Sequence, residues 1–373
     1  MSVPLQSARA GRRVALLPGL TGFGTSLARV SAVVVAIAFS VAATAFTAVA
    51  GASFPGRNGR LAVELDGCEA TPFIRFFTVG GKDLGVLSPP CEVVGQLEEG
   101  DVLRETSLYG FSPDGGRLLL SQRGAAPLGL ITVGADGTDP RALPAPPNAA
   151  DASFAPDGRQ IVFMSQGAIW RAATDGGQRQ RLRPSVTCDL KVRDCVEFER
   201  PRWSPDGKLI AFEVHQTGFG SGRPPAIRPG IWLMSARTGK LTRRVARGGF
   251  EVDWSPDSRR LAYRTSYEQD ETEGGASGGN LWVVSATGNG ARRVVHRQRL
   301  AEIVPTWSPD GRWIAWISLR LGKGDVGFDV KPSLWRVRAG GGRPRRITGL
   351  PAPSVEEGDF LEPRLAWQPL AAG

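Results

Sequence analysis

The sequence predicts an all-β fold: a six-bladed β-propeller of four-stranded antiparallel blades, preceded by an N-terminal apolar helix. Three observations predict it. A ten-residue phrase recurs along the chain, short strand-like segments and Gly-rich turns follow each copy, and the C-terminal segment supplies a strand that the first unit lacks. Repeats of four short strands are typical of propeller blades.

The recurring phrase is clearest at residues 307–316, where Trp-Ser-Pro-Asp-Gly is followed by an apolar run. Ser-Pro-Asp-Gly suits a type I turn, because Pro presets φ at the second position and Gly eases the exit. Related phrases occupy residues 111–120, 154–163, 203–212 and 254–263. Each is therefore predicted to be a hairpin that forms the first two strands of a blade.

Two further strands are expected in every repeat, separated by a Gly-rich turn. Third strands are predicted at residues 129–133, 168–172, 230–234, 280–284 and 333–337. Fourth strands, rich in Arg, are predicted at residues 141–143, 179–182, 241–245, 292–295 and 345–348.

The two ends of the propeller complement each other. The first unit starts at Phe54 with strands predicted at 60–64, 73–79 and 83–87, but it has no room for a first strand. Residues 363–369 resemble that missing strand, so the C-terminus is predicted to close the ring. Six apolar anchors mark the six blades: Phe111, Phe154, Trp203, Trp254, Trp307 and Trp367.

The net charge of +10 is only weak evidence for a nucleic-acid partner, because part of it lies in the N-terminal region. Residues 1–52 contain four arginines and no acid, so residues 53–373 have 42 basic and 36 acidic residues, an excess of 6. That mild excess is a poor argument for a polyanion, and no nucleic-acid partner is expected.

The N-terminal residues 1–52 are predicted to be a basic n-region followed by a signal peptide or a membrane anchor. Residues 30–52 are uncharged and follow Arg29, a pattern typical of exported proteins. Residues 48–50 fit a small-x-small cleavage site, while the length of the apolar run also suits a retained anchor. Residues 53–373 form the predicted propeller domain, exported and in contact with the membrane only through the N-terminal segment.

The repeated phrase, with its following Ile-Ala-Phe-like and Ile-Trp-Val-like strands, resembles the TolB-like six-bladed propellers of bacterial envelope proteins. The resemblance covers residues 54–369. It implies a non-enzymatic scaffold that binds an envelope protein, or a peptide or glycan ligand, and we expect a monomer without a cofactor. The alternatives are a propeller enzyme, either a lyase or a hydrolase, and a polysaccharide-binding module.

Binding is expected on the face that carries the long loops, at residues 215–229, 266–279 and 319–332, because variable loops on a rigid scaffold commonly carry function. Charged residues that precede the first strands should converge on the central channel there. They form either a hydrated rim of paired ions or a pocket for a polar ligand. These candidate residues are Asp151, Glu199, Arg200, Arg202, Glu251, Asp253, Glu302, Glu362 and Arg364.

The four cysteines predict two disulfides, Cys68 to Cys91 and Cys188 to Cys195, because an even number at neighbouring positions in an exported protein favours pairing. Their spacing is not that of a metal site, and no metal is expected. Residues 275–279 match the Gly-x-Ser-x-Gly pattern of a hydrolase nucleophile elbow. They lie in a predicted polar loop, so we do not expect them to be catalytic.

Overall fold

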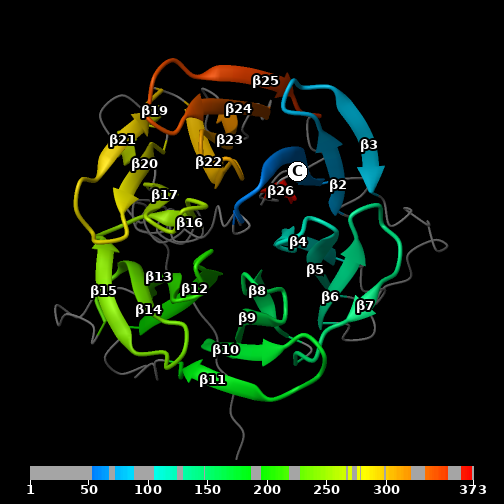
Figure 1. Cartoon of the computed structure of the whole chain (residues 1–373). Coiled ribbons are helices and arrows are strands. Elements are labelled where there is room, and N and C mark those ends of the chain that lie inside the picture. The colour runs from blue at the N-terminus through cyan, green and yellow to red at the C-terminus, as the bar shows by residue number, and fades with distance from the viewer. Residues whose placement is uncertain are drawn as a thin grey trace, which may run out of the picture. The chain divides into compact units, whose positions relative to one another are not determined.

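The computed structural model describes residues 53–66, 72–87, 105–123, 129–146, 148–185, 195–217, 227–265, 268–270, 275–277, 279–297, 300–320, 332–351 and 363–371. Within these residues the regular structure consists of six four-stranded antiparallel sheets and one two-stranded sheet. Figure 1 shows the six sheets following one another around a central axis. The predicted six-bladed propeller is therefore confirmed.

The first three blades each run from an inner strand beside the axis to an outer strand. Blade one contains β26 (Arg364–Leu370), β1 (Arg57–Asp66), β2 (Pro72–Phe77) and β3 (Asp83–Leu87). Blade two contains β4 (Glu105–Phe111), β5 (Arg117–Arg123), β6 (Gly129–Gly134) and β7 (Arg141–Ala142). Blade three contains β8 (Ala150–Phe154), β9 (Gln160–Ser165), β10 (Ala168–Ala173) and β11 (Arg179–Arg183).

The remaining three blades have the same order. Blade four contains β12 (Cys195–Trp203), β13 (Leu209–Thr217), β14 (Gly230–Ser235) and β15 (Leu241–Ala246). Blade five contains β16 (Phe250–Trp254), β17 (Arg260–Arg264), β20 (Leu281–Ser285) and β21 (Arg292–Val295). Blade six contains β22 (Leu300–Trp307), β23 (Trp313–Arg320), β24 (Ser333–Arg338) and β25 (Arg345–Gly349).

The repeated Pro-Asp turns are held by their own side chains, as the sequence predicts. In blade four the Asp206 carboxylate accepts hydrogen bonds from the Ser204 hydroxyl at 2.7 Å and from the Lys208 backbone N–H at 3.1 Å. Blade five has Ser258 where the other repeats have Gly, and Ser258 adopts the same left-handed conformation, with φ of 59°. The side chains of these turns are thus committed to backbone geometry.

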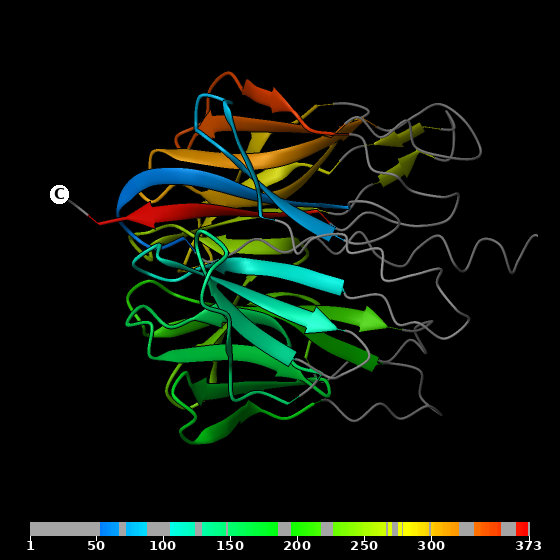
Figure 2. The same cartoon turned by 90° about the vertical axis from the view of Figure 1, so that its right-hand side faces the viewer.

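The turns between the third and fourth strands lie on the same face as the Pro-Asp turns. In blade four the Ala236 N–H donates to the Lys208 carbonyl at 3.0 Å, and blades two, three, five and six have equivalent bonds. We call this face the turn face. The other ends of the strands form the loop face, and Figure 2 shows the hairpin of β18 (Glu268–Asp270) and β19 (Gly275–Ser277) projecting on that side.

The hydrophobic core is divided into six clusters, and each cluster fills the space between two neighbouring blades. Between blades five and six, for example, Trp307 and Trp316 are fully buried against Leu281. Strands with apolar side chains on both faces suit this stacking, because every sheet packs against a sheet on either side. The recurring tryptophans therefore serve packing between blades.

The C-terminal strand closes the ring. β26 pairs antiparallel with β1, with Leu61 opposite Trp367 and Val63 opposite Leu365. Both β26 residues are buried, in a cluster that also contains Ile303 and Ile317 of blade six. The predicted closure of blade one by the C-terminus is confirmed.

The segment before β1 lies at the centre of the ring. Ser53 is 1% exposed and donates its backbone N–H to Asp253 at 3.2 Å. Phe54 is 2% exposed and packs in the cluster of Tyr109 and Phe154, which belong to blades two and three. Because neighbouring residues contact blades on opposite sides of the ring, this segment crosses the axis. At Gly56 it reaches the turn face, where its N–H bonds the Pro309 carbonyl at 3.2 Å.

Asp253 holds this segment through a proton-sensitive contact. Burial raises the pKa of Asp253 to about 7, although hydrogen bonds from the Trp307 N–H and from Ser53 act to lower it. The Ser53 hydroxyl lies 2.8 Å from the Asp253 carboxylate and 2.6 Å from the Trp307 carbonyl. One hydroxyl hydrogen serves only one acceptor, so a proton on Asp253 allows both contacts to be hydrogen bonds.

The N-terminal helix and the boundary at residue 52 fall outside the described residues and stay predictions. Among the described residues, no helix is long and apolar enough to span a bilayer.

Deleting β26 should unfold or strongly destabilise the ring. A chain that ends at residue 362 is expected to lose more than about 4 kcal/mol of stability, because removing one buried Trp side chain such as Trp367 already costs roughly that amount. Thermal unfolding of the full chain, this truncation and a control ending at Ala371 measures the effect. Equal melting of all three would contradict ring closure by β26.

The Asp253 contact predicts a pH dependence of stability. Folded Asp253 keeps its proton up to about pH 7, whereas the unfolded chain releases it above about pH 4. The contribution of this proton to the free energy of unfolding is therefore complete below about pH 4 and is lost as the pH rises through about 7. The loss reaches up to about 1.4 kcal/mol per pH unit. Urea unfolding between about pH 5 and 8 measures it. Asp253→Asn should cost about 1–3 kcal/mol and lack this component. Parallel pH curves for the two proteins would contradict it.

Candidate functional site

The inner strands of blades three to six share a β-bulge next to the axis. Asp151, Arg200, Glu251 and Val304 occupy it, with φ of 50°, 49°, 58° and 48°, and the strand register shifts at each. A bulge re-aims the side chains around it, and a non-Gly residue with positive φ persists only where its surroundings hold it. Three of the four bulge residues are charged, so the bulges bring charges together around the axis.

A four-residue charge network lies in blade four. The Arg200 guanidinium is 2% exposed, and its Nη1 lies 2.8 Å from Glu213 Oε2 and 3.2 Å from Glu199 Oε2. His215 Nε2 lies 3.0 Å from the same Glu213 oxygen. The His215 ring stacks on Phe250 of blade five, with centroids 4.8 Å apart. The network thus connects two blades near the loop face, where the exposed fractions of Glu199 and His215 are 26% and 18%.

The two carboxylates of this network have opposite electrostatic environments. Burial alone would raise the pKa of Glu213, but Arg200 and His215 outweigh it and hold that pKa at about 2. Burial raises the pKa of Glu199, despite the attraction of Arg200. Glu213 is therefore a permanent anion that balances Arg200, whereas the more accessible Glu199 takes up a proton more readily.

Two buried carboxylates, Glu213 and Glu251, each join their blade to the next one. The second oxygen of Glu213 accepts the Val252 N–H of blade five at 3.1 Å. Glu251 pairs with Arg264 at 2.8 Å in blade five and accepts the Val304 N–H of blade six at 2.5 Å. Each side chain therefore satisfies a backbone donor that the bulge of the next blade leaves unpaired.

Blade six ends this series with a partly accessible cation. Arg297 makes a two-pronged contact with Glu302, at 2.6 and 2.9 Å, and the Trp316 indole N–H also donates to Glu302. The Arg297 guanidinium lies 4.0 Å from the ring centroid of Trp335, a cation–π contact. Arg297 is 19% exposed, whereas Glu302 is fully buried.

Other predicted site residues are placed elsewhere around the axis. Arg202 is fully buried and donates to the Pro201 carbonyl at 3.0 Å. Arg364 lies 3.6 Å from Glu64 and 4.9 Å from the Tyr109 ring centroid, in blades one and two. Asp253 contacts Ser53 as described above, Asp151 is half-buried, and Glu362 lies outside the described residues.

Sequence reasoning missed three charged residues on the second strands. Glu64, Glu213 and Arg264 each follow the three-residue apolar run of a buried strand, at 61–63, 210–212 and 261–263. A charge at the end of such a run was the available signal, because a buried ion needs a partner on a neighbouring strand. His215, also on a second strand, belongs to the same group.

Glu199, Glu213 and His215 are the described residues whose ligand atoms could meet at one metal ion, since these atoms lie within 4.8 Å of one another. Arg200 already supplies a positive charge to both carboxylates. A cation added there would face that guanidinium at close range. The donor set therefore fits an ion-pair network better than a metal centre.

Several predictions concern residues outside the described part. Cys68, Cys91 and Cys188 are among them, and Cys195 begins β12 with its side chain undescribed, so both disulfides stay predictions. The segment 266–279 was expected to be a loop, but part of it forms the β18–β19 hairpin. The first three residues of the Gly-x-Ser-x-Gly match form β19 of this hairpin, where a catalytic elbow would need a strand-to-helix turn.

Comparison with known proteins places this ring among TolB-like propellers. No family model matches the chain. A TolB homolog of Chlorobium luteolum is 27% identical over 175 residues, which are 45% of this chain and 34% of that protein. The Tol-Pal system protein TolB of Anaeromyxobacter dehalogenans is 35% identical over 154 residues, which are 40% of this chain and 29% of that protein.

The aligned region spans less than half the length of these relatives. A solved structure assigned to TolB from Agrobacterium tumefaciens superposes with a TM-score of 0.50, covering 78% of this chain and 89% of that one at 19% identity. This likeness concerns the fold. Together with the sequence relatives, it identifies the chain as a TolB-like six-bladed propeller.

Proposed function

We propose that this protein is an exported scaffold of the bacterial cell envelope, and that it binds a protein or peptide partner on the loop face around blades four to six. The resemblance to TolB, together with relatives named as TolB homologs and as a Tol-Pal system protein, supports the envelope role. The partly exposed charge network of Glu199 and His215 carries the choice of surface.

The loop face has partly exposed charged and polar side chains that a binding partner could contact. Glu199, His215 and Arg297 are partly exposed. The His215 ring stacks on Phe250, and the Arg297 guanidinium lies over the Trp335 ring. Charged groups beside aromatic rings are common in recognition surfaces, because the ring gives contact area and the charge gives orientation. A basic or polar peptide segment suits Glu199, whose carboxylate is not fully neutralised by Arg200.

The turn face is a poorer binding surface. Its Asp side chains accept hydrogen bonds from their own turns, as Asp206 and Asp310 do. Its turns are also fixed to one another by backbone hydrogen bonds in five blades. These groups would have to break existing bonds before they could bind a partner.

Photocrosslinking tests which face binds. A photoreactive amino acid at Gln216, exposed at the loop-face end of β13, should capture an envelope protein from living cells, whereas the same group at Asp206 on the turn face should not. Mass spectrometry identifies the captured protein. Capture from Asp206 alone would overturn the choice of face, and capture from neither position would contradict the scaffold role.

Two neighbouring carboxylates should separate binding from stability. Glu199→Gln should weaken binding of the captured partner at nearly unchanged melting temperature, because Arg200 keeps its contact with Glu213. Glu213→Gln should cost about 3 kcal/mol of stability, because Arg200 would lose its buried counter-ion. Affinity and urea unfolding of both variants, with Asp175→Asn on the turn face as control, measure this. Unchanged affinity for Glu199→Gln would contradict the proposed contact.

A further inference from the structure

The outermost strands of four consecutive blades carry an unusual concentration of arginine. Segments 179–183, 241–247, 291–297 and 343–349 contain twelve arginines and no acidic residue. They cover β11, β15, β21 and β25, which lie on the periphery of the ring in Figure 1. Eight of the twelve are exposed: Arg179, Arg181, Arg243, Arg247, Arg293, Arg343, Arg345 and Arg346.

These charges are mostly not neutralised by the protein. Among the described residues, only Arg297 of the twelve forms an ion pair, with Glu302. Several others bond backbone carbonyls of a neighbouring turn or blade, as Arg243 does with Thr287 at 3.0 Å. A carbonyl bond orients the guanidinium and leaves its charge in place. Burial and then the cations Arg228 and Arg247 lower the pKa of Arg244, which is a sign of crowded positive charge.

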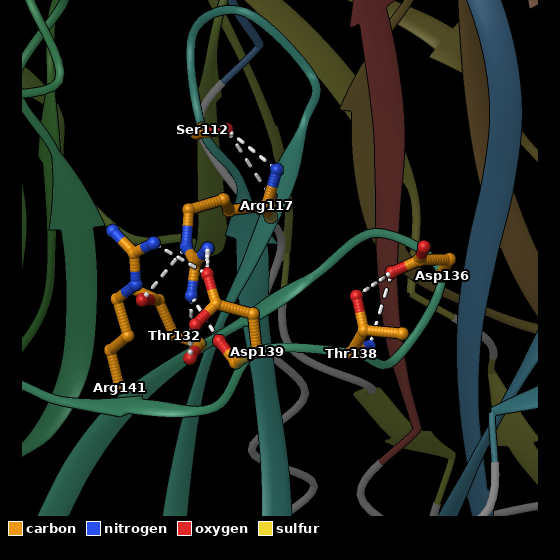
Figure 3. Close-up of polar contacts among 7 residues, drawn as sticks. All are labelled: Ser112, Arg117, Thr132, Asp136, Thr138, Asp139 and Arg141. Atoms are coloured by element: carbon orange, nitrogen blue, oxygen red, sulfur yellow. Dashed lines mark hydrogen bonds and ion pairs between the residues drawn. The ribbon is translucent and has the colours of Figure 1, made fainter.

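Blades one and two differ from this pattern. In blade two, Asp139 lies between Arg117 and Arg141, at 2.8 and 2.6 Å, so the arginine of the outer strand is paired (Figure 3). In blade one, Asp83 of the outer strand pairs with Arg75 at 2.8 Å. Among the described residues of the outer strands, the arginines without an ion pair therefore lie in blades three to six. We call the surface that they form the arginine belt.

Protection of exposed sheet edges is the simpler explanation for charge on outer strands. Native edge strands are protected mainly by lysine, and mixed charges would protect an edge with less repulsion. The belt uses arginine alone, three in each segment, and the four segments contain no lysine. The choice of arginine indicates a partner of the opposite sign, because the guanidinium fork fits the two oxygens of a carboxylate or phosphate.

We propose that the arginine belt binds a flexible acidic polysaccharide, with carboxylate or phosphate groups, along the circumference of blades three to six. The belt covers four of the six blades, more than half of a closed ring. A flat bilayer could touch only part of that convex surface, whereas a flexible chain can follow it. Among the described residues no aromatic side chain is one of the large exposed hydrophobics, and the tryptophans beside the belt, such as Trp170, are half-buried. The belt therefore has no fully exposed ring on which nucleic-acid bases could stack.

This inference goes beyond the proposed function, because it concerns the periphery and not the loop face. The test uses the full-length protein with labelled alginate, which carries carboxylates, and long-chain polyphosphate. Neutral dextran, phosphatidylglycerol vesicles and single-stranded DNA are compared with them. We expect one or both anionic chains to bind with an affinity that falls steeply with salt, since each neutralised charge adds to the slope.

Two variants that lose the same amount of positive charge distinguish binding by the belt from attraction by the net charge of the protein. The belt variant carries Arg179→Gln, Arg181→Gln, Arg345→Gln and Arg346→Gln. The control removes four exposed cations from the turn face, with Arg159→Gln, Lys208→Gln, Arg259→Gln and Arg312→Gln. The belt variant should bind on the order of tenfold more weakly with a smaller salt slope, and the control should change little.

Each outcome decides the proposal. Selective loss of polymer binding in the belt variant supports it, and the better probe shows whether carboxylate or phosphate is recognised. An equal loss of affinity in both variants would mean that the anionic chains respond only to net charge, and would overturn the proposal. Tighter binding to vesicles or DNA than to both anionic chains, or no binding to either chain, would also overturn it. Partner capture at Gln216 is unaffected by any of these results.

Discussion

The ring depends on buried carboxylates that accept backbone N–H groups of the next blade. Glu64 accepts from Leu108, Glu213 from Val252, Glu251 from Val304 and Asp253 from Trp307. The acceptor and donor lie 39 to 54 residues apart in these pairs. The apolar clusters hold the blades together without direction, whereas these bonds fix the position of one inner strand relative to the next.

The bonds to Leu108, Val252 and Val304 solve a problem that the bulges create. A bulge removes a backbone donor from the ladder of its own sheet, and an unpaired buried donor is costly. A carboxylate that satisfies such a donor in its ionised form is itself a buried charge and needs a cation, as Glu213 needs Arg200 and Glu251 needs Arg264. The charge at the axis is therefore first a structural requirement. Only its outer members, such as Glu199 and His215, remain partly accessible for binding.

The contacts that hold the ring together and the surfaces proposed for binding thus lie in different parts of the blades. The inner strands hold paired, mostly buried charges that join the blades, and the turn face holds side chains bonded within their turns. Accessible charges that lie outside these turns are found on the loop face and on the outer strands. This separation allows substitutions in the surfaces proposed for binding with little effect on the ring, because exposed charges contribute little to stability.

Sequence alone determined the blade count, the position of most strands and closure by the C-terminus. These follow from local signals: the Pro-Asp turns, the short apolar runs and the missing first strand. It also indicated that charges precede the inner strands, but not that Arg200 pairs with Glu213 on the adjacent strand or that Asp253 holds Ser53. Only the tertiary structure decided those pairs, and only it gathered the arginines of four outer strands on one periphery. The reason is physical: neighbours across blades are set by closure of the ring, and a charge's partner depends on what lies beside it in space, not in sequence.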